Sequence, residues 1–307
     1  MTARLYVSDL DGTLLRSDAT LSATARDGLN QLLDAGLAFT VATSRSAPAI
    51  RALLTGVRLT LPIIELNGAF ITNLDSGHHI QQRTLDTGVA DDAVQALRDA
   101  AIEPILTTWD GVDDHMYYTP GAQANPGNAW YIAEKHAYGD PRLRLHHDDL
   151  ADVVDIEQIA TVTTFLPHSQ ACTLVSRLRL LLGDCALVTS AVNSYVPGYS
   201  EVQVAHPDAQ KGSAVARLRD NLGLTEAPLT VFGDHLNDLP MFEVADHAIA
   251  TANAQPAVLA QADQIVETND NDGVLRYLWI ERGDERSPSA IPADRSTPTA
   301  STSLNDT

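Results

Sequence analysis

The chain has 307 residues, of which 44% are hydrophobic, and its formal net charge is −20. This length suits two domains better than one, and the hydrophobic content is ordinary for a globular protein with a sizeable core. The negative charge argues against nucleic acid as a general partner, and no apolar run is long enough to span a bilayer.

The N-terminus leads straight into an apolar segment, without the basic region, apolar core and cleavage site of a secretory signal. Only two cysteines are present, Cys172 and Cys185. We expect both to be reduced packing residues and not a disulfide framework. These features fit a cytoplasmic protein best.

The first predicted strand, over residues 4–8, is mostly apolar and leads into two aspartates, Asp9 and Asp11, followed by Gly12. Side chains two apart on an extended segment point the same way, so both carboxylates can face one site at the carboxyl end of the strand. Two carboxylates that close repel unless a cation or a shared proton lies between them, and hard oxygen ligands favour Mg²⁺. An alternative is that the segment is only a turn, because Asp and Gly favour turns.

Strands and helices alternate over the next part of the chain. Three strand ends in this region therefore carry polar side chains, because the second and third predicted strands lead into Thr43 with Ser44, and into Asn67. Such alternation implies a doubly wound, Rossmann-like parallel sheet, in which active sites lie beyond the carboxyl ends of the strands. The predicted elements are helices over residues 21–36 and 47–54 and strands over residues 37–42 and 62–66.

The alternation stops near Arg83 and gives way to an α+β order, which indicates a second domain inserted into the first. Large aromatic residues in this segment, such as Trp130 and Tyr131, are more often buried in a core than placed in a binding site. The predicted helices cover residues 91–101, 128–137 and 168–182, and the predicted strands cover residues 105–109, 116–119, 159–165, 186–189 and 201–205.

The first domain resumes with a helix that begins at Lys211 and a strand over residues 229–232 that leads into Gly233 and Asp234. After residue 283 Ser, Pro, Thr, Asp and Ala dominate, which is typical of a disordered tail. Further short strands over residues 248–250 and 264–266 and helices over residues 256–262 and 273–282 complete the domain. We therefore predict a catalytic core from residues 1–83 and 207–282, an inserted α+β cap over residues 84–206, and a tail over residues 283–307.

The strand ends supply the parts that phosphoryl transfer needs. Asp234 lies directly at a strand end, so we expect it to bind the cation, with Asp238 behind it. Asp238 and Asn237 could instead only cap the following helix. A carboxylate can attack phosphorus if Mg²⁺ and the Lys211 ammonium keep it ionised, and a second carboxylate can move the protons.

Other polar residues allow simpler explanations. Lys211 is one of only two lysines, the other being Lys135. Asp208 could hold the Lys211 ammonium group or be only a charge on the loop. The histidine-containing segments at residues 78–79 and 146–149 lack the ligand spacing of zinc sites, so we expect them to be solvated loops.

Taken together, the segments 9–13, 43–45, 211–212 and 233–238 resemble the phosphatases of the haloacid dehalogenase (HAD) superfamily. The insertion after the third strand resembles the Cof-like group of that superfamily. The resemblance implies that Asp9 is the nucleophile, Asp11 the general acid and base, and Mg²⁺ the cofactor. Ser44 stands where the family often has glycine.

The remaining assignments also rest on the resemblance. The catalytic residues would be Asp9, Asp11, Thr43 and Lys211. The Mg²⁺ ligands would be Asp9, Asp11 through its side chain or its main chain, and Asp234, with Asp238 behind them. The phosphate would be held by Leu10 through its backbone, Thr43, Ser44, Lys211 and Asn237.

We therefore predict a Mg²⁺-dependent phosphatase that hydrolyses small phosphorylated metabolites, such as sugar phosphates or phosphorylated cofactors, through an aspartyl-phosphate. One alternative is a phosphosugar mutase of the same superfamily, and another is a binding or regulatory protein without catalysis. Neither nucleic acids nor membranes are expected as partners. The sequence does not predict the physiological substrate or the oligomeric state.

Overall fold

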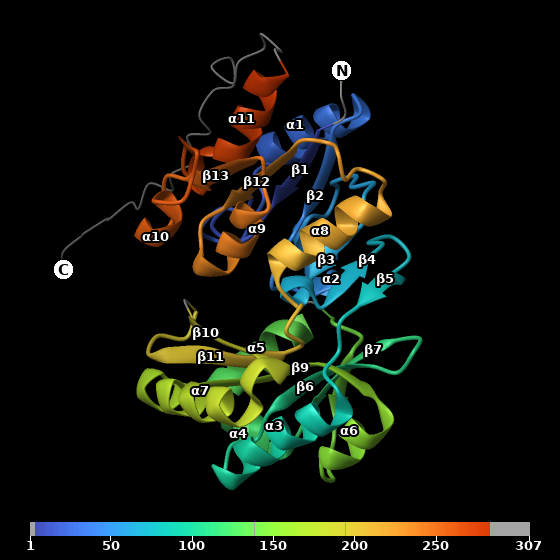
Figure 1. Cartoon of the computed structure of the whole chain (residues 1–307), viewed down its shortest axis with the longest axis vertical. Coiled ribbons are helices and arrows are strands. Elements are labelled where there is room, and N and C mark those ends of the chain that lie inside the picture. Colours follow the sequence, from blue (N-terminus) through green and yellow to red (C-terminus); the bar gives the residue numbers. More distant parts are fainter. Residues whose placement is uncertain (1–3, 138, 194, 283–307) are drawn as a thin grey trace, which may run out of the picture.

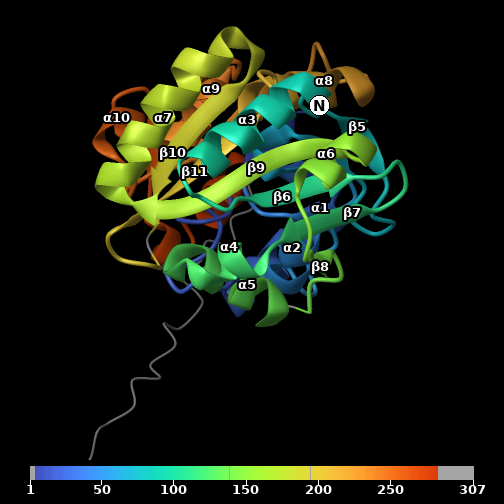
Figure 2. The ribbon, with the colours of Figure 1, turned by 90° about the horizontal axis from the view of Figure 1, so that it is seen from below.

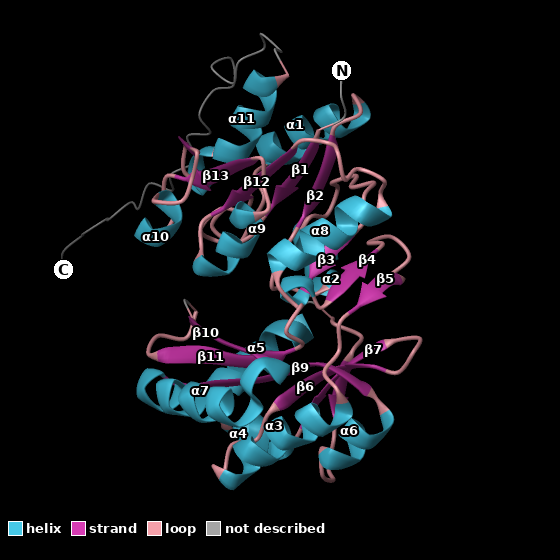
Figure 3. Cartoon of the chain, in the orientation of Figure 1, coloured by secondary structure: helices cyan, strands magenta, loops and turns pink. Residues whose placement is uncertain are grey.

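The computed structural model describes residues 4–137, 139–193 and 195–282. Two parts of the molecule are stacked along its long axis and connected by two segments of chain (Figure 1). Each part contains a sheet flanked by helices, as the colouring of Figure 3 makes clear. The tail predicted over residues 283–307 lies outside the described residues.

The core part is built on a five-stranded parallel sheet with the strand order β14-β13-β12-β1-β2. Leu5 and Val7 of β1 face one apolar cluster, whereas Tyr6 faces another, because side chains alternate between the two faces of a strand. Helices cover both faces, which explains why the strands are apolar throughout. The strands are β1 (Leu5–Ser8), β2 (Ala38–Val41), β12 (Leu229–Gly233), β13 (His247–Thr251) and β14 (Gln264–Val266).

One face of this sheet packs against α1, α2 and α11, and the opposite face against α8, α9 and α10. This two-sided arrangement confirms the predicted doubly wound α/β core. The helices are α1 (Ala23–Asp34), α2 (Ala47–Leu53), α8 (Lys211–Asn221), α9 (Leu239–Glu243), α10 (Pro256–Leu259) and α11 (Gly273–Glu281).

The third predicted strand does not belong to the parallel sheet. β3 (Ile63–Glu65) pairs antiparallel with β4 (Phe70–Thr72), which pairs in turn with β5 (His79–Gln82). β3 meets the core sheet at the bridge between Ala42 and Ile64. β4 and β5 are not predicted from the sequence because they are three and four residues long and lie beside polar turns.

The second part is built on a six-stranded sheet with the order β10-β11-β9-β6-β7-β8. The helices α3, α6 and α7 cover one face of this sheet, and α4 and α5 cover the other. In Figure 2 α3 and α7 cross the strands on the side away from the core, whereas Figure 1 shows α5 on the side next to the core. The α+β insertion is therefore present, as predicted, and we refer to it as the cap.

The cap elements agree in part with the predicted ones. α7 has the predicted bounds, α3 begins earlier than predicted, and the short elements β8, α4 and α6 were missed. The strands are β6 (Ile105–Trp109), β7 (Asp114–Tyr118), β8 (Leu143–Leu145), β9 (Gln158–Pro167), β10 (Leu187–Val192) and β11 (Tyr199–Ala205). The helices are α3 (Thr87–Asp99), α4 (Pro120–Ala124), α5 (Pro126–Ala137), α6 (Ala151–Ile156) and α7 (His168–Leu182).

Among the described residues, no helix combines the length and apolarity that crossing a bilayer requires. Cys172 and Cys185 are free, exposed thiols. The two cysteines are therefore not joined in a disulfide, as expected, but neither fills a packing position, so that part of the expectation was wrong.

Candidate active site

Asp9 and Asp234 meet at one edge of the core sheet because each directly follows one of two adjacent parallel strands. β1 pairs in register with β12, and the Asp9 N–H continues the ladder by donating to the carbonyl of Phe232 at 3.0 Å. Asp234 is the residue after Gly233, the last of β12. The carboxyl ends of the strands thus bring two carboxylates together that are 225 positions apart in the chain (234 − 9).

Lys211 lies between two of the carboxylates at this edge, those of Asp9 and Asp238. Its Nζ donates to Asp9 Oδ1 and to Asp238 Oδ1, each at 2.6 Å, and the lysine is only 1% exposed. Burial alone would lower the pKa of the ammonium group, but Asp238 and Asp9 outweigh it and raise the pKa above its ordinary value. Lys211 is therefore a fixed positive charge. Asp208 is exposed and pairs with Arg83, so of its two predicted roles the loop charge is the one that fits, and it does not hold the Lys211 ammonium group.

Asp238 supports this arrangement from behind. It is completely buried, and its Oδ2 accepts from the backbone N–H groups of Asp234 and His235 at 2.9 and 3.0 Å. Its other oxygen accepts from Lys211. Both oxygens are thus occupied by protein donors, which fixes the lysine and the loop that carries Asp234.

One lysine does not balance the negative charge at this edge. Burial, followed by Asp238, raises the pKa of Asp234 to about 6, although Thr13 donates to its Oδ1 at 2.9 Å. Burial also raises the pKa of Asp9, with Lys211 opposing and the other carboxylates adding to the rise. A further cation at the site would reverse both shifts.

The donor set fits a hard divalent cation. Carboxylate oxygens of Asp9, Asp234 and Asp238 lie within 4.8 Å of one another. Oxygen-only ligands and excess negative charge are what Mg²⁺ requires. Because both oxygens of Asp238 already have protein donors, Asp9 and Asp234 are the residues with oxygens left for an ion.

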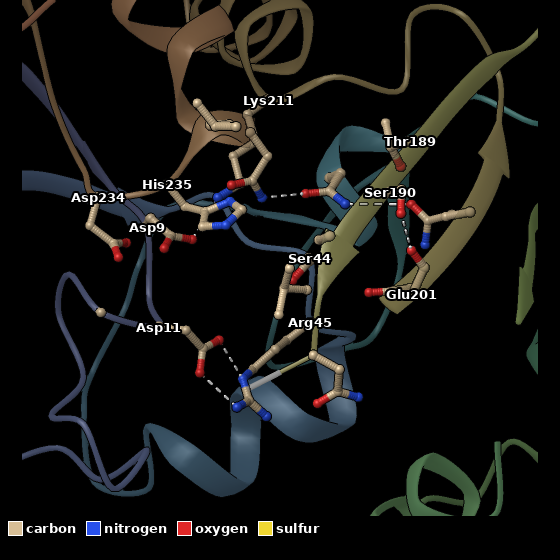
Figure 4. A pocket seen from close by; sticks show the side chains of 18 of the residues that line it. Asp9, Asp11, Ser44, Arg45, Thr189, Ser190, Glu201, Lys211, Asp234 and His235 are labelled. Atoms are coloured by element: carbon tan, nitrogen blue, oxygen red, sulfur yellow. Dashed lines mark hydrogen bonds and ion pairs between the residues drawn. The ribbon is translucent and has the colours of Figure 1, made fainter. Parts of the chain in front are cut away.

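The Asp11 side chain is not part of this group. Its two oxygens accept from Nε and Nη2 of Arg45, each at 2.7 Å. Figure 4 shows the carboxylate directed at Arg45 and away from Lys211. The sequence prediction named Asp11 among the metal ligands, and in this arrangement its side chain is engaged elsewhere.

The predicted phosphate ligands divide into two groups. Ser44, Lys211 and Asn237 line the cavity, and Asn237 donates to Asn67 Oδ1 at 3.0 Å. Thr43, by contrast, is fully buried, and its hydroxyl accepts from the Arg45 N–H at 3.2 Å. The side chain of Leu10 is also fully buried in the core. A role for Thr43 in holding the loop that carries Ser44 fits this geometry better than direct contact with a ligand.

Asp9, Asp234 and Lys211 line a cavity of about 820 Å³ to which both the core and the cap contribute. The core side also includes Asp11, Ser44, Arg45 and Asn237. Its cap side is formed largely by α5, β10 and β11 and includes Trp130, Tyr131, Glu134, Lys135, Phe165, Tyr195, Glu201 and Gln203.

The cap wall is aromatic and contains a buried charge. Trp130 stacks on Tyr195, with ring centroids 5.2 Å apart, and the Lys135 ammonium lies 4.3 Å from the centre of the Tyr131 ring. Burial raises the pKa of Glu201 to about 7, although Lys135 opposes this shift. Sequence reasoning missed this wall and assigned Trp130 and Tyr131 to core packing. The scarcity of lysine was the one signal that could have pointed to Lys135.

His79 corrects another expectation, because it is buried and not part of a solvated loop. Its Nε2 lies 2.5 Å from Asp114 Oδ1 of the cap, and its Nδ1 bonds Thr72 at 2.8 Å on the core side. Glu65 lies 3.7 Å from the same Nδ1. Glu65 and Asp114 thus face opposite ring nitrogens of His79, and the three side chains connect the core to the cap.

The fold and site define the class of protein. The chain belongs to the haloacid dehalogenase-like hydrolases, since the model of that family matches residues 6–278. This finding confirms the predicted superfamily.

Individual relatives cover almost the whole of the described chain. A 5-amino-6-(5-phospho-D-ribitylamino)uracil phosphatase of Bacillus subtilis, YwtE, is 27% identical over 285 residues, with 88% of this chain and 95% of that protein covered. An HMP-PP phosphatase of Enterobacter sp. is also 27% identical, with 91% and 97% covered. A crystal structure of a haloacid dehalogenase-like hydrolase from Bacteroides thetaiotaomicron superposes with a TM-score of 0.71 at 24% identity, covering 91% of this chain and 98% of the other.

Proposed function

We propose that the protein is a Mg²⁺-dependent phosphatase that hydrolyses small phosphorylated metabolites through an aspartyl-phosphate on Asp9. The observation that carries this proposal is the buried Lys211, which lies between Asp9 and Asp238 beside the carboxylate of Asp234, a group of side chains that could hold a metal ion. A carboxylate held next to two cations stays ionised and can attack phosphorus.

The reaction divides into two displacements. An Asp9 oxygen attacks phosphorus while the bond to the alcohol oxygen of the substrate breaks, and Asp11 gives that oxygen a proton. Asp11 then takes a proton from water, whose oxygen attacks phosphorus while the bond from phosphorus to the Asp9 oxygen breaks, so that inorganic phosphate leaves and Asp9 is regenerated. Lys211, Ser44 and Asn237 orient the phosphate from the cavity wall. A Mg²⁺ ion held by Asp9 and Asp234 would neutralise negative charge on the phosphoryl oxygens.

The substrate would extend from the phosphate site into the cap. The inserted segment 84–206 would act as a closing cap that excludes water and contacts the alcohol part of the substrate. Relatives act on HMP-PP and on a phosphoribitylaminouracil. The stacked Trp130 and Tyr195 and the Tyr131 ring would suit a phosphorylated cofactor with a planar ring. Sugar phosphates remain within the proposed class. We place the reaction in the cytoplasm.

The proposal is tested by incubating the purified protein with 4-nitrophenyl phosphate and with a panel of phosphorylated sugars and cofactors, with and without Mg²⁺. We expect Mg²⁺-dependent release of inorganic phosphate by the wild type and none by Asp9→Asn with an unchanged circular dichroism spectrum. Normal turnover in Asp9→Asn would contradict the nucleophile, and no turnover by the wild type would contradict the phosphatase. A shifted phosphate on a hexose 1-phosphate would indicate the mutase.

A further inference from the structure

Glu201 is a carboxyl group of the cap that the proposed reaction does not use. Side chains alternate along β11, so Val202 and Val204 pack in the apolar cluster beneath the cap helices, whereas Glu201 and Gln203 line the cavity. Figure 4 shows Glu201 across the cavity from Asp9. The carboxyl group of Glu201 is therefore placed to contact the alcohol part of a substrate whose phosphate lies beside Asp9.

The described part of the chain supplies no bonding partner for this carboxyl group. No described residue donates a hydrogen bond to its side-chain oxygens or forms an ion pair with them, and the Ser190 hydroxyl donates to the Glu201 backbone carbonyl instead, at 3.0 Å. Burial raises the pKa of Glu201 to about 7, with Lys135 opposing the rise and Glu134 adding to it. A buried carboxyl group that the protein leaves unbonded is a candidate for binding a ligand.

The lysine of the same wall is bonded to other groups. Lys135 Nζ donates to Glu134 Oε2 at 3.1 Å and lies 4.3 Å from the centre of the Tyr131 ring. Burial alone would lower the pKa of Lys135, but Tyr131 and Glu134 raise it above its ordinary value, so the ammonium group keeps its charge. Lys135 thus moderates the pKa of Glu201 without bonding to it, and Glu201 is left for a ligand.

Aromatic rings line the same side of the cavity as Glu201. Trp130 and Tyr195 are stacked with an angle of 14° between their planes, and the ring centroids of Tyr131 and Phe165 are 5.1 Å apart. Burial raises the pKa of Tyr131, and the charge of Glu201 adds to the rise, so this ring and the carboxyl group are neighbours. Such a wall suits a flat ring, and the carboxyl group requires a hydrogen-bonding atom in that ring.

We propose that Glu201 is a specificity-determining residue that binds a basic ring nitrogen, and that the substrates are phosphate esters of hydroxymethyl groups on planar nitrogen heterocycles. A protonated Glu201 donates to the ring nitrogen, and an ionised Glu201 accepts from a protonated nitrogen, so the same two atoms bond in either case. A carbocyclic ring would leave the buried carboxyl group unbonded. This inference rests on the proposed function, because it requires the phosphate to lie beside Asp9.

Pyridylmethyl phosphates and benzyl phosphate test this pairing, because they have the same shape and differ by one ring nitrogen. The full chain is assayed with Mg²⁺ on benzyl phosphate and on the ortho, meta and para pyridylmethyl esters. The nitrogen preference is kcat/KM for the best pyridylmethyl ester divided by kcat/KM for benzyl phosphate. We expect a preference of roughly 10- to 100-fold in the wild type, which is the effect of one hydrogen bond to a charged group.

Most of this preference should lie in KM, because the ring nitrogen is bound both before and during the chemical step. Comparing the ratio between proteins cancels the intrinsic reactivity of the esters. Glu201→Leu should reduce the preference to about 1, because no hydrogen bond to the nitrogen remains. Glu201→Gln should keep only part of it, since a hydrogen bond between neutral groups is weaker.

Glu103→Gln is the matched control, because it makes the same change at an exposed cap residue that does not line the cavity. It should show the wild-type preference. Full preference in either Glu201 variant, with an unchanged circular dichroism spectrum, would overturn the inference.

The wild type alone also decides, without a variant. If it hydrolyses benzyl and pyridylmethyl phosphates equally well, or hydrolyses sugar phosphates and rejects the pyridylmethyl esters, the inference is overturned and the phosphatase stands. A wild type inactive on every phosphate would overturn the proposed function, and the inference with it.

Discussion

Lys211 brings one positive charge to an edge of the sheet where three buried or half-buried carboxylates converge. The remaining negative charge raises the pKa of Asp234 to about 6. A carboxyl group whose pKa is raised in the folded state stabilises the protein at low pH. This contribution is lost as the pH rises from the pKa of the unfolded state to that of the folded state. Above pH 6 the ionised carboxylates of the site therefore repel one another and destabilise the folded protein. A bound cation would remove this repulsion.

Added Mg²⁺ should consequently stabilise the protein more at pH 8 than at pH 5, because at pH 5 the cation must displace protons from the carboxylates. At a Mg²⁺ concentration about 100 times its Kd, the gain at pH 8 is about 2.7 kcal/mol. Thermal unfolding monitored by circular dichroism, with and without Mg²⁺ at each pH, measures this gain in stability. Asp234→Asn should abolish the shift, and equal Mg²⁺ shifts in the variant and the wild type would contradict Asp234 as a ligand.

Glu201 gives a second prediction for a single residue. Burial raises its pKa to about 7, so the folded state holds this proton more tightly than the unfolded chain does. Its contribution to stability is full below the unfolded pKa and is lost as the pH rises to about 7. Glu201→Gln should therefore reduce the fall in the free energy of unfolding between pH 5 and pH 8 by about 1–2 kcal/mol.

Urea unfolding at the two pH values checks this prediction. Glu103→Gln, a substitution at an exposed residue elsewhere in the cap, is the control. Its free energy of unfolding should fall between the two pH values by as much as that of the wild type. If the free energy of unfolding of Glu201→Gln falls as much as that of the wild type over this pH interval, the ionisation of Glu201 does not cause the fall.

The sequence predicted the core of the site because each key residue stands beside a strand end or helix start. Asp9, Asp234 and Lys211 needed only the parallel pairing of β1 and β12 and the start of α8 to converge. The pairing of Arg45 with Asp11 could not be predicted in the same way, since it depends on a side-chain orientation. The cap wall was not predicted because its residues line the cavity only when the cap lies over the core. The sequence does not show how these two parts pack against each other.

At the scale of elements, the turn after β1 decides how closely two strands can bring their carboxylates together. Gly12 has a φ of 75°, and a side chain there would overlap the Asp234 carboxylate. Its carbonyl accepts from Asn253 at 2.8 Å and from Thr251 at 3.2 Å, which ties the turn to the end of β13. Gly12 is thus required both for the turn and for space at the site.

Gly12→Ala should lower stability by about 1–2 kcal/mol through backbone strain and should also displace Asp234. We expect at least a 10-fold loss of phosphatase activity together with a weaker Mg²⁺ effect on the melting temperature. Gly36 also has a positive φ, of 83°, but with open space around it, so Gly36→Ala would strain the backbone without displacing a neighbour. This control should lose stability but keep its activity. Comparable activity in the two variants would refute the role of Gly12 at the site.

Elements of at least five residues with strong apolar patterns were predicted well, as α7 and β6 illustrate. The elements that were not predicted are short ones, namely β4, β5, β8, α4 and α6, and the pairing of β3 was predicted wrongly. A short apolar strand does not reveal its partner, so β3 was placed in the parallel sheet although it pairs antiparallel with β4. The hairpin contributes His79 to the network with Asp114, and therefore affects how the cap is attached.

At the scale of the whole molecule, the cavity exists because the cap lies over the carboxyl ends of the core strands (Figure 1). The core supplies charges that suit a phosphate and a cation, and the cap supplies rings and a buried lysine. Such a division allows one chemical step to serve different substrates. The domain boundaries predicted at residues 83 and 207 remain a prediction.

The most direct test of the account is to trap the covalent phosphate. Wild-type protein turning over its best substrate with Mg²⁺ is quenched with borohydride, which reduces an aspartyl-phosphate to homoserine, and the peptides are analysed by mass spectrometry. The account predicts homoserine at position 9, dependent on both substrate and Mg²⁺. Homoserine at another aspartate, or an active enzyme in which position 9 is never modified, would contradict it.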